Sequence, residues 1–325
     1  MWAYIVDQND GPFRRRDIPR PKPAAGEALV RIHASGVNPL DTKIRAGKAP
    51  HANHPLPAVL GLDMAGTVEE VGPGVTAFAP GDEVYGMVGG VGGVQGTLAE
   101  YVAADADLLA HKPKALSMAQ AAALPLATIT AWEGLVDRAR VREGQKVLIH
   151  AGAGGVGNIA MQIAKAFRAE VFATVSAEKR KVVEDCGAVA IDYRTRTAAA
   201  YVAEETGGLG FDIVYDTVGG STLDDSFTAV KRYSGHVVSS LGWGTHALAP
   251  LSFRGATYSG VFTLLPLLTG QQRAHHGRIL AQAAALADDG KLRPYLNSRR
   301  FATEDLDAAY ALVAAGSAGK VVLEM

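Results

Sequence analysis

The stretch KVLIHAGAGGVGNIAMQIAKAF, residues 146–167, decides the fold of this chain. It begins with an unbroken apolar run, continues through Gly152-x-Gly154-x-x-Gly157, and ends in a segment whose apolar residues recur at helical spacing. A lone GxGxxG is weak evidence, but here a strand precedes it and a helix follows it. A turn without side chains lets backbone N–H groups approach a pyrophosphate at the helix N-terminus. The stretch therefore predicts a dinucleotide-binding unit; a tight turn without a ligand is the alternative.

The sequence around this stretch repeats the alternation of strand and helix. Apolar runs that helical segments separate lie at residues 146–151, 170–176, 188–193, 211–216 and 236–242. Continuous apolar strands indicate burial on both faces, which parallel sheets impose. Strict alternation of strand and helix predicts a doubly wound α/β fold for this part of the chain.

The sequence before and after this region has a different pattern. Up to about residue 124, short segments such as EALVRIHASG and AGTVEEVGPG alternate, and Pro and Gly separate them, which is typical of antiparallel or barrel-like β structure. After about residue 268 we expect two amphipathic helices and a closing strand, GKVVLEM. The second helix has its apolar stripe at Leu306, Ala309, Tyr310 and Val313. The glycine cluster at 86–96 indicates either a mobile lobe or a close-packed one.

Composition excludes several classes of protein. A chain of 325 residues is long for one core and sufficient for two domains. Its 32 basic and 33 acidic residues give a net charge of −1, so no overall attraction to nucleic acid or to an anionic membrane is expected. The single cysteine, Cys186, can form neither an internal disulfide nor a zinc–thiolate site, which fits a reducing cytosol. Without a signal-like N-terminus or a long apolar run, we expect a cytoplasmic protein with no membrane partner.

The end of the second apolar run predicts which dinucleotide binds. An NAD site places a carboxylate there, whereas this chain has Ser176, followed by Lys179 and Arg180. A serine with nearby cations can hold the 2′-phosphate that a carboxylate would repel. Tyr193, at the end of the third run, is a further candidate for the same phosphate, and we expect Glu178 to point outward. We therefore predict NADPH as the cofactor; a solvated basic helical turn is the alternative.

Motifs along nearly the whole chain resemble one family. They are GVNPLDTKIRAG, PAVLGLDMAGTVEEVGPGV, GDEVYG, GTLAEYV, LPLATITAW, VLIHAGAGGVGNIAMQIAK, YDTVGG and GKVVLEM. Together they resemble the zinc-independent quinone oxidoreductases, the ζ-crystallin-like branch of the medium-chain dehydrogenase/reductase superfamily. The resemblance implies a GroES-like β-barrel catalytic domain over residues 1–126 and a Rossmann NADPH-binding domain over 127–266. It also implies that residues 267–325 return to the catalytic domain.

The resemblance also bears on metal binding. In the zinc alcohol dehydrogenases of this superfamily a cysteine ligand stands at the place of Asn38, a histidine at that of Leu62, and a glutamate at that of Asp63. Neither Asn38 nor Leu62 can coordinate as those ligands do, and the glycine cluster at 86–96 replaces the lobe with four cysteines. Zinc needs N, S or carboxylate ligands at tetrahedral positions, so we predict no metal site.

A cleft without a metal restricts the acceptors that it can reduce. Zinc would stabilise the alkoxide formed from a plain ketone. Quinones and α,β-unsaturated carbonyls instead delocalise the incoming charge into a phenolate or enolate, and hydrogen-bond donors complete the stabilisation. We therefore predict an NADPH-dependent reductase of quinones or conjugated carbonyls. An alkenal or enoyl-thioester reductase on the same scaffold, and an NADPH-binding protein with weak turnover like some ζ-crystallin relatives, are the alternatives.

The resemblance places two polar residues at the chemistry. Asn38 is expected near the nicotinamide, where its amide can donate to a substrate oxygen, and Asp41 is expected to orient Asn38 or to relay a proton. A turn asparagine and a helix N-cap are the alternatives. The tyrosine that related quinone reductases often have in the following segment is missing here. The proton donor therefore stays open, with Lys43, His51 or His54 as weak substitutes.

The resemblance implies further cofactor contacts in the glycine loop and at the ends of the parallel strands. The residues expected to bind the cofactor are Asn38, Thr128, Gly152, Gly154, Gly155, Val156, Gly157, Ser176, Lys179, Arg180, Tyr193, Val218, Ser240, Leu241, Gly242, Phe262 and Lys320. Trp243 and Phe262 are candidates for the wall of an apolar acceptor pocket. We also expect a homodimer, in which the apolar run SGVFTLLPLLTG, residues 259–270, extends a sheet across a two-fold axis; burial within one chain is the alternative.

Overall fold

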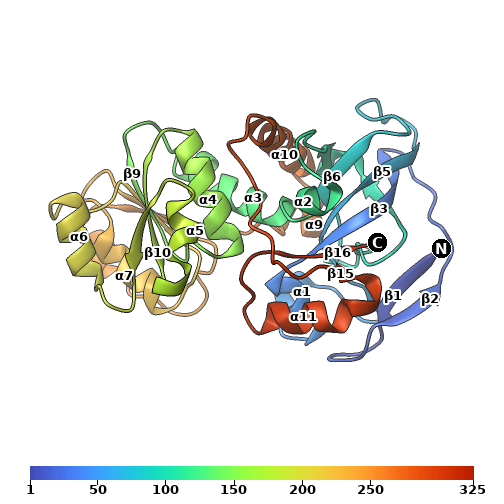
Figure 1. The fold of residues 1–325 in the computed structure, drawn as a ribbon, viewed down its shortest axis with the longest axis horizontal. Coiled ribbons are helices and arrows are strands. Elements are labelled where there is room, and N and C mark those ends of the chain that lie inside the picture. Colours follow the sequence, from blue (N-terminus) through green and yellow to red (C-terminus); the bar gives the residue numbers. More distant parts are fainter. The chain divides into compact units, whose positions relative to one another are not determined.

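The chain, described by a computed structural model over residues 1–325, divides into two compact units. The first unit joins residues 1–126 to residues 264–325, and the second consists of residues 127–263. The N-terminal segment, blue in Figure 1, therefore belongs to the same unit as the red C-terminal segment. The second unit ends at Thr263.

The second unit is built on a six-stranded parallel sheet with the order β11–β10–β9–β12–β13–β14. Its strands are β9 (Lys146–Ile149), β10 (Glu170–Val175), β11 (Val189–Asp192), β12 (Ile213–Asp216), β13 (His236–Ser239) and β14 (Thr257–Gly260). The five apolar runs form β9 to β13, so the predicted doubly wound α/β fold is confirmed. The order of strands reverses beside β9, and doubly wound sheets bind ligands at such a reversal.

The helices of the second unit follow the strands in alternation. They are α3 (Pro125–Trp132), the π-helical turn Glu133–Arg138, α4 (Gly155–Ala166), α5 (Arg180–Glu184), α6 (Ala198–Thr206), α7 (Ser221–Ala229) and α8 (Ala249–Ser252). Helix α3 begins two residues before the second unit does. Where strands and helices alternate in this way, the loops at the carboxyl ends of the strands lie along one edge of the sheet.

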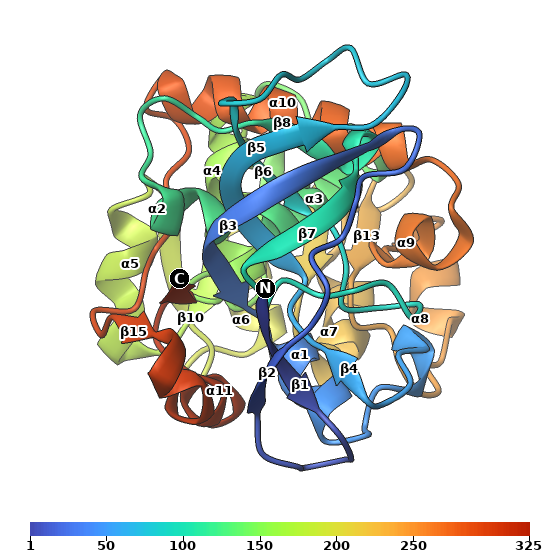
Figure 2. The same ribbon diagram turned by 90° about the vertical axis from the view of Figure 1, so that its right-hand side faces the viewer.

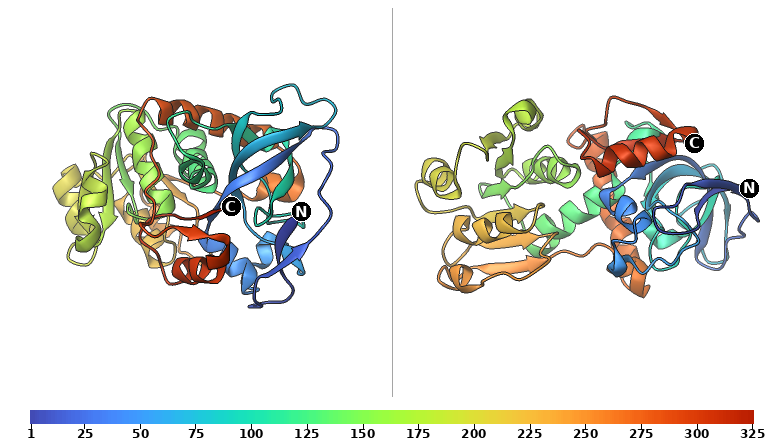
Figure 3. Two further views of the ribbon diagram at one scale, coloured as in Figure 1. Left: turned by 45° about the vertical axis from the view of Figure 1, so that its right-hand side comes forward. Right: turned by 90° about the horizontal axis from the view of Figure 1, so that it is seen from below.

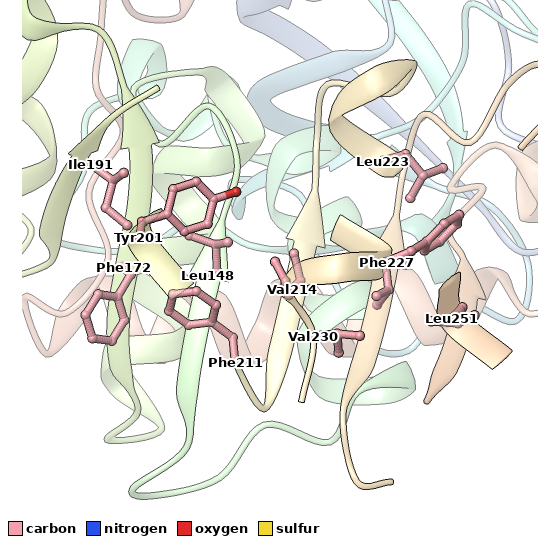
Figure 4. Packing of buried hydrophobic residues seen from close by; sticks show 12 residues of the cluster. Leu148, Phe172, Ile191, Tyr201, Phe211, Val214, Leu223, Phe227, Val230 and Leu251 are labelled. Atoms are coloured by element: carbon pink, nitrogen blue, oxygen red, sulfur yellow. The ribbon is translucent and has the colours of Figure 1, made fainter. Parts of the chain in front are cut away.

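An aromatic core holds the strands of this unit in place. The rings of Phe172 and Phe211 meet edge to face with centroids 5.3 Å apart, and Tyr201 lies 6.3 Å from Phe211. Figure 4 shows these rings gathered beside Leu148, and Val214 follows on the neighbouring strand. Burying an aromatic or large aliphatic side chain stabilises a fold by roughly 1.5–3 kcal/mol. The packing of this cluster therefore stabilises the parallel sheet that carries the binding loops.

The first unit consists mainly of antiparallel β structure. Its strands are β1 (Trp2–Val6), β2 (Arg14–Asp17), β3 (Glu27–Val37), β4 (Ala58–Val59), β5 (Asp63–Val71), β6 (Glu83–Met87), β7 (Tyr101–Asp105), β8 (Leu109–His111), β15 (Phe301–Ala302) and β16 (Val321–Glu324). The larger sheet has the order β15–β16–β3–β5–β6–β8, and β7 also pairs with β3 (Figure 2). Because β16 pairs with β3, the end of the chain is part of this sheet.

The helices of the first unit cover its sheets. They are α1 (Pro39–Arg45), α2 (Met118–Ala122), α9 (Leu265–Thr269), α10 (Arg273–Asp288) and α11 (Leu306–Ala314). The predicted stripe on α11 is buried, and α11, red in Figure 3, packs against the blue α1. No helix in the structure combines the length and the apolar character that a membrane span requires.

The glycine cluster at 86–96 is close-packed. A Cβ added at Gly89 would lie 1.9 Å from the carbonyl oxygen of Gln95, and one at Gly96 would lie 2.3 Å from that of Leu60. Both distances are far shorter than van der Waals contact, so side chains do not fit at these two positions. The glycines therefore allow neighbouring backbone segments to approach each other.

Candidate active site

The glycine loop joins β9 to α4. Some of its glycines are buried against the sheet, and others are exposed. A Cβ at Gly152 would lie 2.6 Å from the Cβ of Ala173, and one at Gly157 would lie 2.2 Å from the carbonyl oxygen of Ala151. These two glycines are buried and allow the loop to pack on the sheet. Gly155 is exposed, and a Cβ there would meet no atom within 4 Å. At Gly155, therefore, no other atom of the chain covers the outer surface of the loop.

The start of α4 suits an anion. Gly154 is the N-cap of this 12-residue helix and offers no side-chain acceptor to the N–H groups of the first turn. Free N–H groups and the helix dipole both favour negative charge, and Val156 lies half-buried among them. On α3, the hydroxyl of Thr128 is buried and has no hydrogen-bond partner, as expected for a group that pairs with a ligand. These features fit the predicted dinucleotide.

The loops after β12 and β13 present an apolar surface at the carboxyl edge of the sheet. Val218 is 47% exposed and Trp243 is 52% exposed. The ring of Trp243 meets that of Phe262 edge to face, with centroids 6.3 Å apart. Directly before Trp243 in the sequence, Ser240 and Leu241 are half-buried and Gly242 is exposed. Val218, Ser240–Gly242, Trp243 and Phe262 are therefore all at least partly exposed, and all belong to the second unit.

The end of β10 carries a carboxylate that was expected to point away. Glu178 is exposed, but the hydroxyl of Ser176 donates a hydrogen bond to it, and this bond is the main reason why the pKa of Glu178 is lowered. The Nη1 of Arg194 lies 2.9 Å from Oε1 of the same carboxylate. Arg194 therefore belongs to this part of the surface. It was not predicted from the sequence, although the motif IDYR places it directly after Tyr193.

The other residues predicted to bind the 2′-phosphate are Arg180, Tyr193 and Lys179, and they differ in their ion pairs and in their exposure. Arg180 forms an ion pair with Glu184 one helical turn along α5, at 2.6 Å. Tyr193 is 56% exposed at the end of β11. Lys179 is half-buried and forms no ion pair with any carboxylate of the chain. Among these cations, Lys179 is the one whose charge no protein acid offsets.

The first unit contains a buried polar cluster, which we define as Asn38, Asp41, Asp63 and Lys320. Asn38 follows β3, Asp63 begins β5 and Lys320 precedes β16. The central strand β3 pairs with both other strands, in the registers Gly36 to Asp63 and Val37 to Val321. Sheet pairing therefore brings together residues that are far apart in the sequence.

Hydrogen bonds connect the members of the polar cluster. The Nδ2 of Asn38 donates to Oδ2 of Asp63 at 2.9 Å, and the Nζ of Lys320 donates to Oδ1 of Asn38. Lys320 Nζ also lies 3.4 Å from Oδ2 of Asp63, whose Oδ1 accepts the backbone N–H of Leu126 at 2.9 Å. Asn38 is 1% exposed and Asp63 is fully buried. These bonds use the oxygen of the Asn38 amide and one of its two N–H groups, and the side chain of Asn38 also hydrogen-bonds to the Asp41 carboxyl.

Asp41 holds the backbone of Asn38. Its Oδ2 accepts the Asn38 N–H at 2.7 Å across the first turn of α1, while its Oδ1 has no partner. Asp41 is fully buried, and this burial raises its pKa to about 7, against the opposing effect of the bond from Asn38. Asp41 is therefore a carboxyl group that exchanges a proton near neutral pH.

We expect Asp41→Asn to raise the free energy of unfolding at pH 8 more than at pH 5. The ordinary pKa of an aspartate is about 4, and burial raises that of Asp41 to about 7. A raised pKa gives stability that is complete below pH 4 and is lost as the pH rises through 7. Asparagine keeps the acceptor for the Asn38 N–H without the charge. The gain at pH 8 should exceed that at pH 5 by about 2–3 kcal/mol.

Urea unfolding of the protein and of this variant at both pH values measures the effect. Asp17→Asn, at an exposed carboxyl on β2, is the control and should change neither value by more than about 0.5 kcal/mol. Equal stabilisation at both pH values would show that the Asp41 carboxyl does not titrate between them.

The chain brings together no group of three or more His, Cys, Asp or Glu side chains that could hold a metal ion. Leu62 is fully buried, and the amide of Asn38 is bonded as described above. His51 and His54, the weak candidates for the proton donor, are half-buried, and Nε2 of His54 lies 3.3 Å from the carbonyl oxygen of Val59.

The chain matches two families. Residues 24–114 match the alcohol dehydrogenase GroES-like domain, and residues 187–323 match the zinc-binding dehydrogenase family. The chain is 36% identical to the 2-methylene-furan-3-one reductase of Solanum lycopersicum, over 91% of its own length and 71% of that protein. It is also 36% identical to the chloroplastic NADPH-dependent alkenal/one oxidoreductase of Arabidopsis thaliana, over 84% and 65%.

Two solved structures are similar to this one over the whole chain. An alcohol dehydrogenase superfamily protein from Novosphingobium aromaticivorans has 56% identity and a TM-score of 0.98, with coverage of 100% of this chain and 99% of that one. The quinone oxidoreductase from Coxiella burnetii has 29% identity and a TM-score of 0.82, with coverage of 100% and 99%. The two matched domains and these relatives show that the chain is related to the quinone and the alkenal/one oxidoreductases. The chain belongs to the medium-chain dehydrogenase/reductase superfamily of oxidoreductases.

Proposed function

We propose that this protein is an NADPH-dependent reductase of conjugated carbonyl compounds, quinones and enones, that works without a metal ion. The observation that supports it is the amide of Asn38, held between Asp63 and Lys320 where the zinc enzymes have a cysteine ligand. A hydrogen-bond donor in that place suits an acceptor that delocalises its own negative charge. The names of the tomato, Arabidopsis and Coxiella proteins all specify conjugated acceptors or quinones.

The residues of this chain would share the work as follows. When bound, NADPH would supply the hydride. The N–H groups at the start of α4 would hold the pyrophosphate, and Thr128 would give its hydroxyl to the same ligand. The amide of Asn38 would donate to the acceptor oxygen, where negative charge collects, with the ammonium of Lys320 adjacent to the amide. In this arrangement Asp41 holds Asn38 in place and is a positioning residue.

The test is NADPH consumption, followed at 340 nm with a panel of quinones, enones, alkenals and enoyl thioesters. We expect turnover with quinones or enones. Chelators should not lower the rate of this turnover. Turnover confined to alkenals or enoyl thioesters would favour the second enzyme function. Tight NADPH binding without turnover of any acceptor would favour a binding protein, and loss of activity with a chelator would contradict the proposal.

We further propose that NADPH is preferred over NADH, with Lys179 as one cation at the 2′-phosphate. Lys179→Gln should weaken NADPH binding about tenfold and leave NADH binding unchanged, because a charge-assisted hydrogen bond contributes about 1.5–3 kcal/mol. Lys181→Gln is the matched control, since Lys181 lies two residues along and pairs with Asp185 at 2.7 Å. Dissociation constants for both dinucleotides, measured by fluorescence titration, decide the matter. Equal loss of NADPH and NADH affinity would place Lys179 elsewhere.

We also propose a homodimer in the reducing cytosol. Strand β14 lies at the edge of the parallel sheet and pairs only with β13. On this strand Tyr258 is 37% exposed, and nearby in sequence Phe253 is 85% exposed and Leu248 57%. An open edge with exposed apolar side chains suits pairing with a second copy. Sedimentation at micromolar concentration should give twice the mass of the chain, and a monomer would contradict the proposal.

A further inference from the structure

Asp216 is a fully buried carboxylate at the carboxyl end of β12. Its Oδ1 accepts the backbone N–H groups of Val218, at 3.0 Å, and of Gly219, at 2.9 Å. Its Oδ2 accepts the hydroxyl of Ser239 at 2.6 Å. No cation pairs with it, and burial lowers the pKa of the neighbouring His150 to about 4, so this histidine is neutral. A buried carboxylate is costly unless hydrogen bonds satisfy it, so these three donors hold it there.

The bond to Ser239 connects the carboxylate to a second loop. Ser239 is the last residue of β13 and is 1% exposed. Its Oγ also accepts the backbone N–H of Leu241 at 3.1 Å. The N–H of Ser240 donates to the backbone carbonyl oxygen of Asp216 at 3.1 Å. One acidic residue therefore connects the loop after β12 to the loop after β13.

The two loops also touch directly. Gly219 has a φ of +80°, in the left-handed region that glycine adopts without strain. A Cβ at Gly219 would lie 2.4 Å from the carbonyl oxygen of Leu241. The loops are thus closely packed as well as hydrogen-bonded, and neither can move far without the other.

We propose that Asp216 is a positioning residue for the cofactor. Together with Ser239 it holds the loops 217–220 and 240–242 in the one arrangement that receives NADPH. The inference rests on the proposed function, because the same loops carry Val218 and Ser240–Gly242, the residues assigned to the cofactor. Asp216 itself is buried and does not touch the ligand. It acts through the backbone groups that it orders.

The first test compares Ser239→Ala with Ser226→Ala. Both serines are buried in the second unit, and the hydroxyl of Ser226 donates only within α7, to the carbonyl oxygen of Thr222 at 2.7 Å. We expect Ser239→Ala to speed hydrogen exchange at the amide of Leu241 and to weaken NADPH binding about tenfold, the effect of one hydrogen bond to a charged group. Ser226→Ala should change neither quantity.

The second test adds Asp216→Asn and the double variant. Asp216→Asn should speed exchange at the amides of Val218 and Gly219 and weaken NADPH binding at least as much as Ser239→Ala. Because Asp216 acts on the second loop through Ser239, the loss of NADPH affinity in the double variant should be smaller than the sum of the losses in the two single variants. If Asp216→Asn does not fold, the comparison of Ser239→Ala with its control still decides.

Two results would overturn the inference. One is unchanged exchange at the amides of the loops, and the other is faster exchange with unchanged NADPH affinity. Failure of the unsubstituted protein to bind NADPH would overturn the proposed function instead. In that case the exchange measurements, made without a ligand, would still show whether the carboxylate orders the loops.

Discussion

Replacing Gly155 with valine is expected to abolish tight NADPH binding without weakening the fold. A Cβ at this position meets no protein atom within 4 Å, so the fold tolerates a side chain. The same side chain would cover the N–H groups at the start of α4, which we assign to the pyrophosphate. The expected loss of affinity is about hundredfold or more, equal to ~2.7 kcal/mol, because one or two charge-assisted hydrogen bonds are lost.

Gly157→Ala is the matched variant, two residues further along the loop. Its Cβ would lie 2.2 Å from the carbonyl oxygen of Ala151, so it should lower the free energy of unfolding by about 1–3 kcal/mol, as overpacking does. NADPH titration and thermal unfolding of both variants separate binding from stability. If Gly155→Val binds NADPH normally, the outer surface of the loop does not hold the pyrophosphate.

Lys320→Met is expected to lower the free energy of unfolding by about 3–5 kcal/mol, because it leaves a buried carboxylate without its cation. The side chains of Lys320 and Asp63 are 9% and 0% exposed. Burial raises the pKa of Asp63, and the Lys320 ammonium is the strongest opposing influence. Without the ammonium the pKa rises further, so stability decreases as the pH rises and the loss is larger at pH 8 than at pH 5.5.

The double variant Asp63→Asn with Lys320→Met tests the cause of that loss. It removes both charges, and the amide oxygen of the new asparagine can still accept the Leu126 N–H, so most of the stability should return. Urea unfolding of the two single variants and the double variant completes the cycle. A loss below about 1 kcal/mol for Lys320→Met, typical of an exposed pair, would show that water reaches the polar cluster.

Most of the parallel sheet could be predicted from local patterns. The runs 146–149 and 213–216 are apolar at nearly every position because both faces of the sheet are covered, and they form β9 and β12. The edge strand β14 was not predicted. Its sequence, TYSG, is short, polar and exposed at three of its four residues, so no apolar pattern distinguishes it from a loop. An edge strand receives its place from its neighbour β13 rather than from its own side chains.

At the cofactor loops, the spacing of the glycines predicted where the backbone packs tightly, but it did not predict the hydrogen-bond partners of the side chains. The positions of Gly152 and Gly157 follow from a local motif, and the structure shows the close contacts that require them. The bond from Ser176 to Glu178 and the ion pair of Glu178 with Arg194 could not be predicted, because rotamers and a neighbouring strand decide them. The hydrogen bonds of the Asp216 carboxylate could not be predicted either, since its donors come from two loops.

The sequence by itself determined the class of fold and the glycine loop, because these depend on periodicity and spacing over a few neighbouring residues. The resemblance to the family likewise rests on short motifs of the sequence. Only the tertiary structure decided how Asn38, Asp63 and Lys320 combine into one hydrogen-bonded cluster. They lie at the ends of three strands that are distant in the chain, and strand pairing brings them together. Such contacts depend on long-range register and on burial, neither of which a local pattern records.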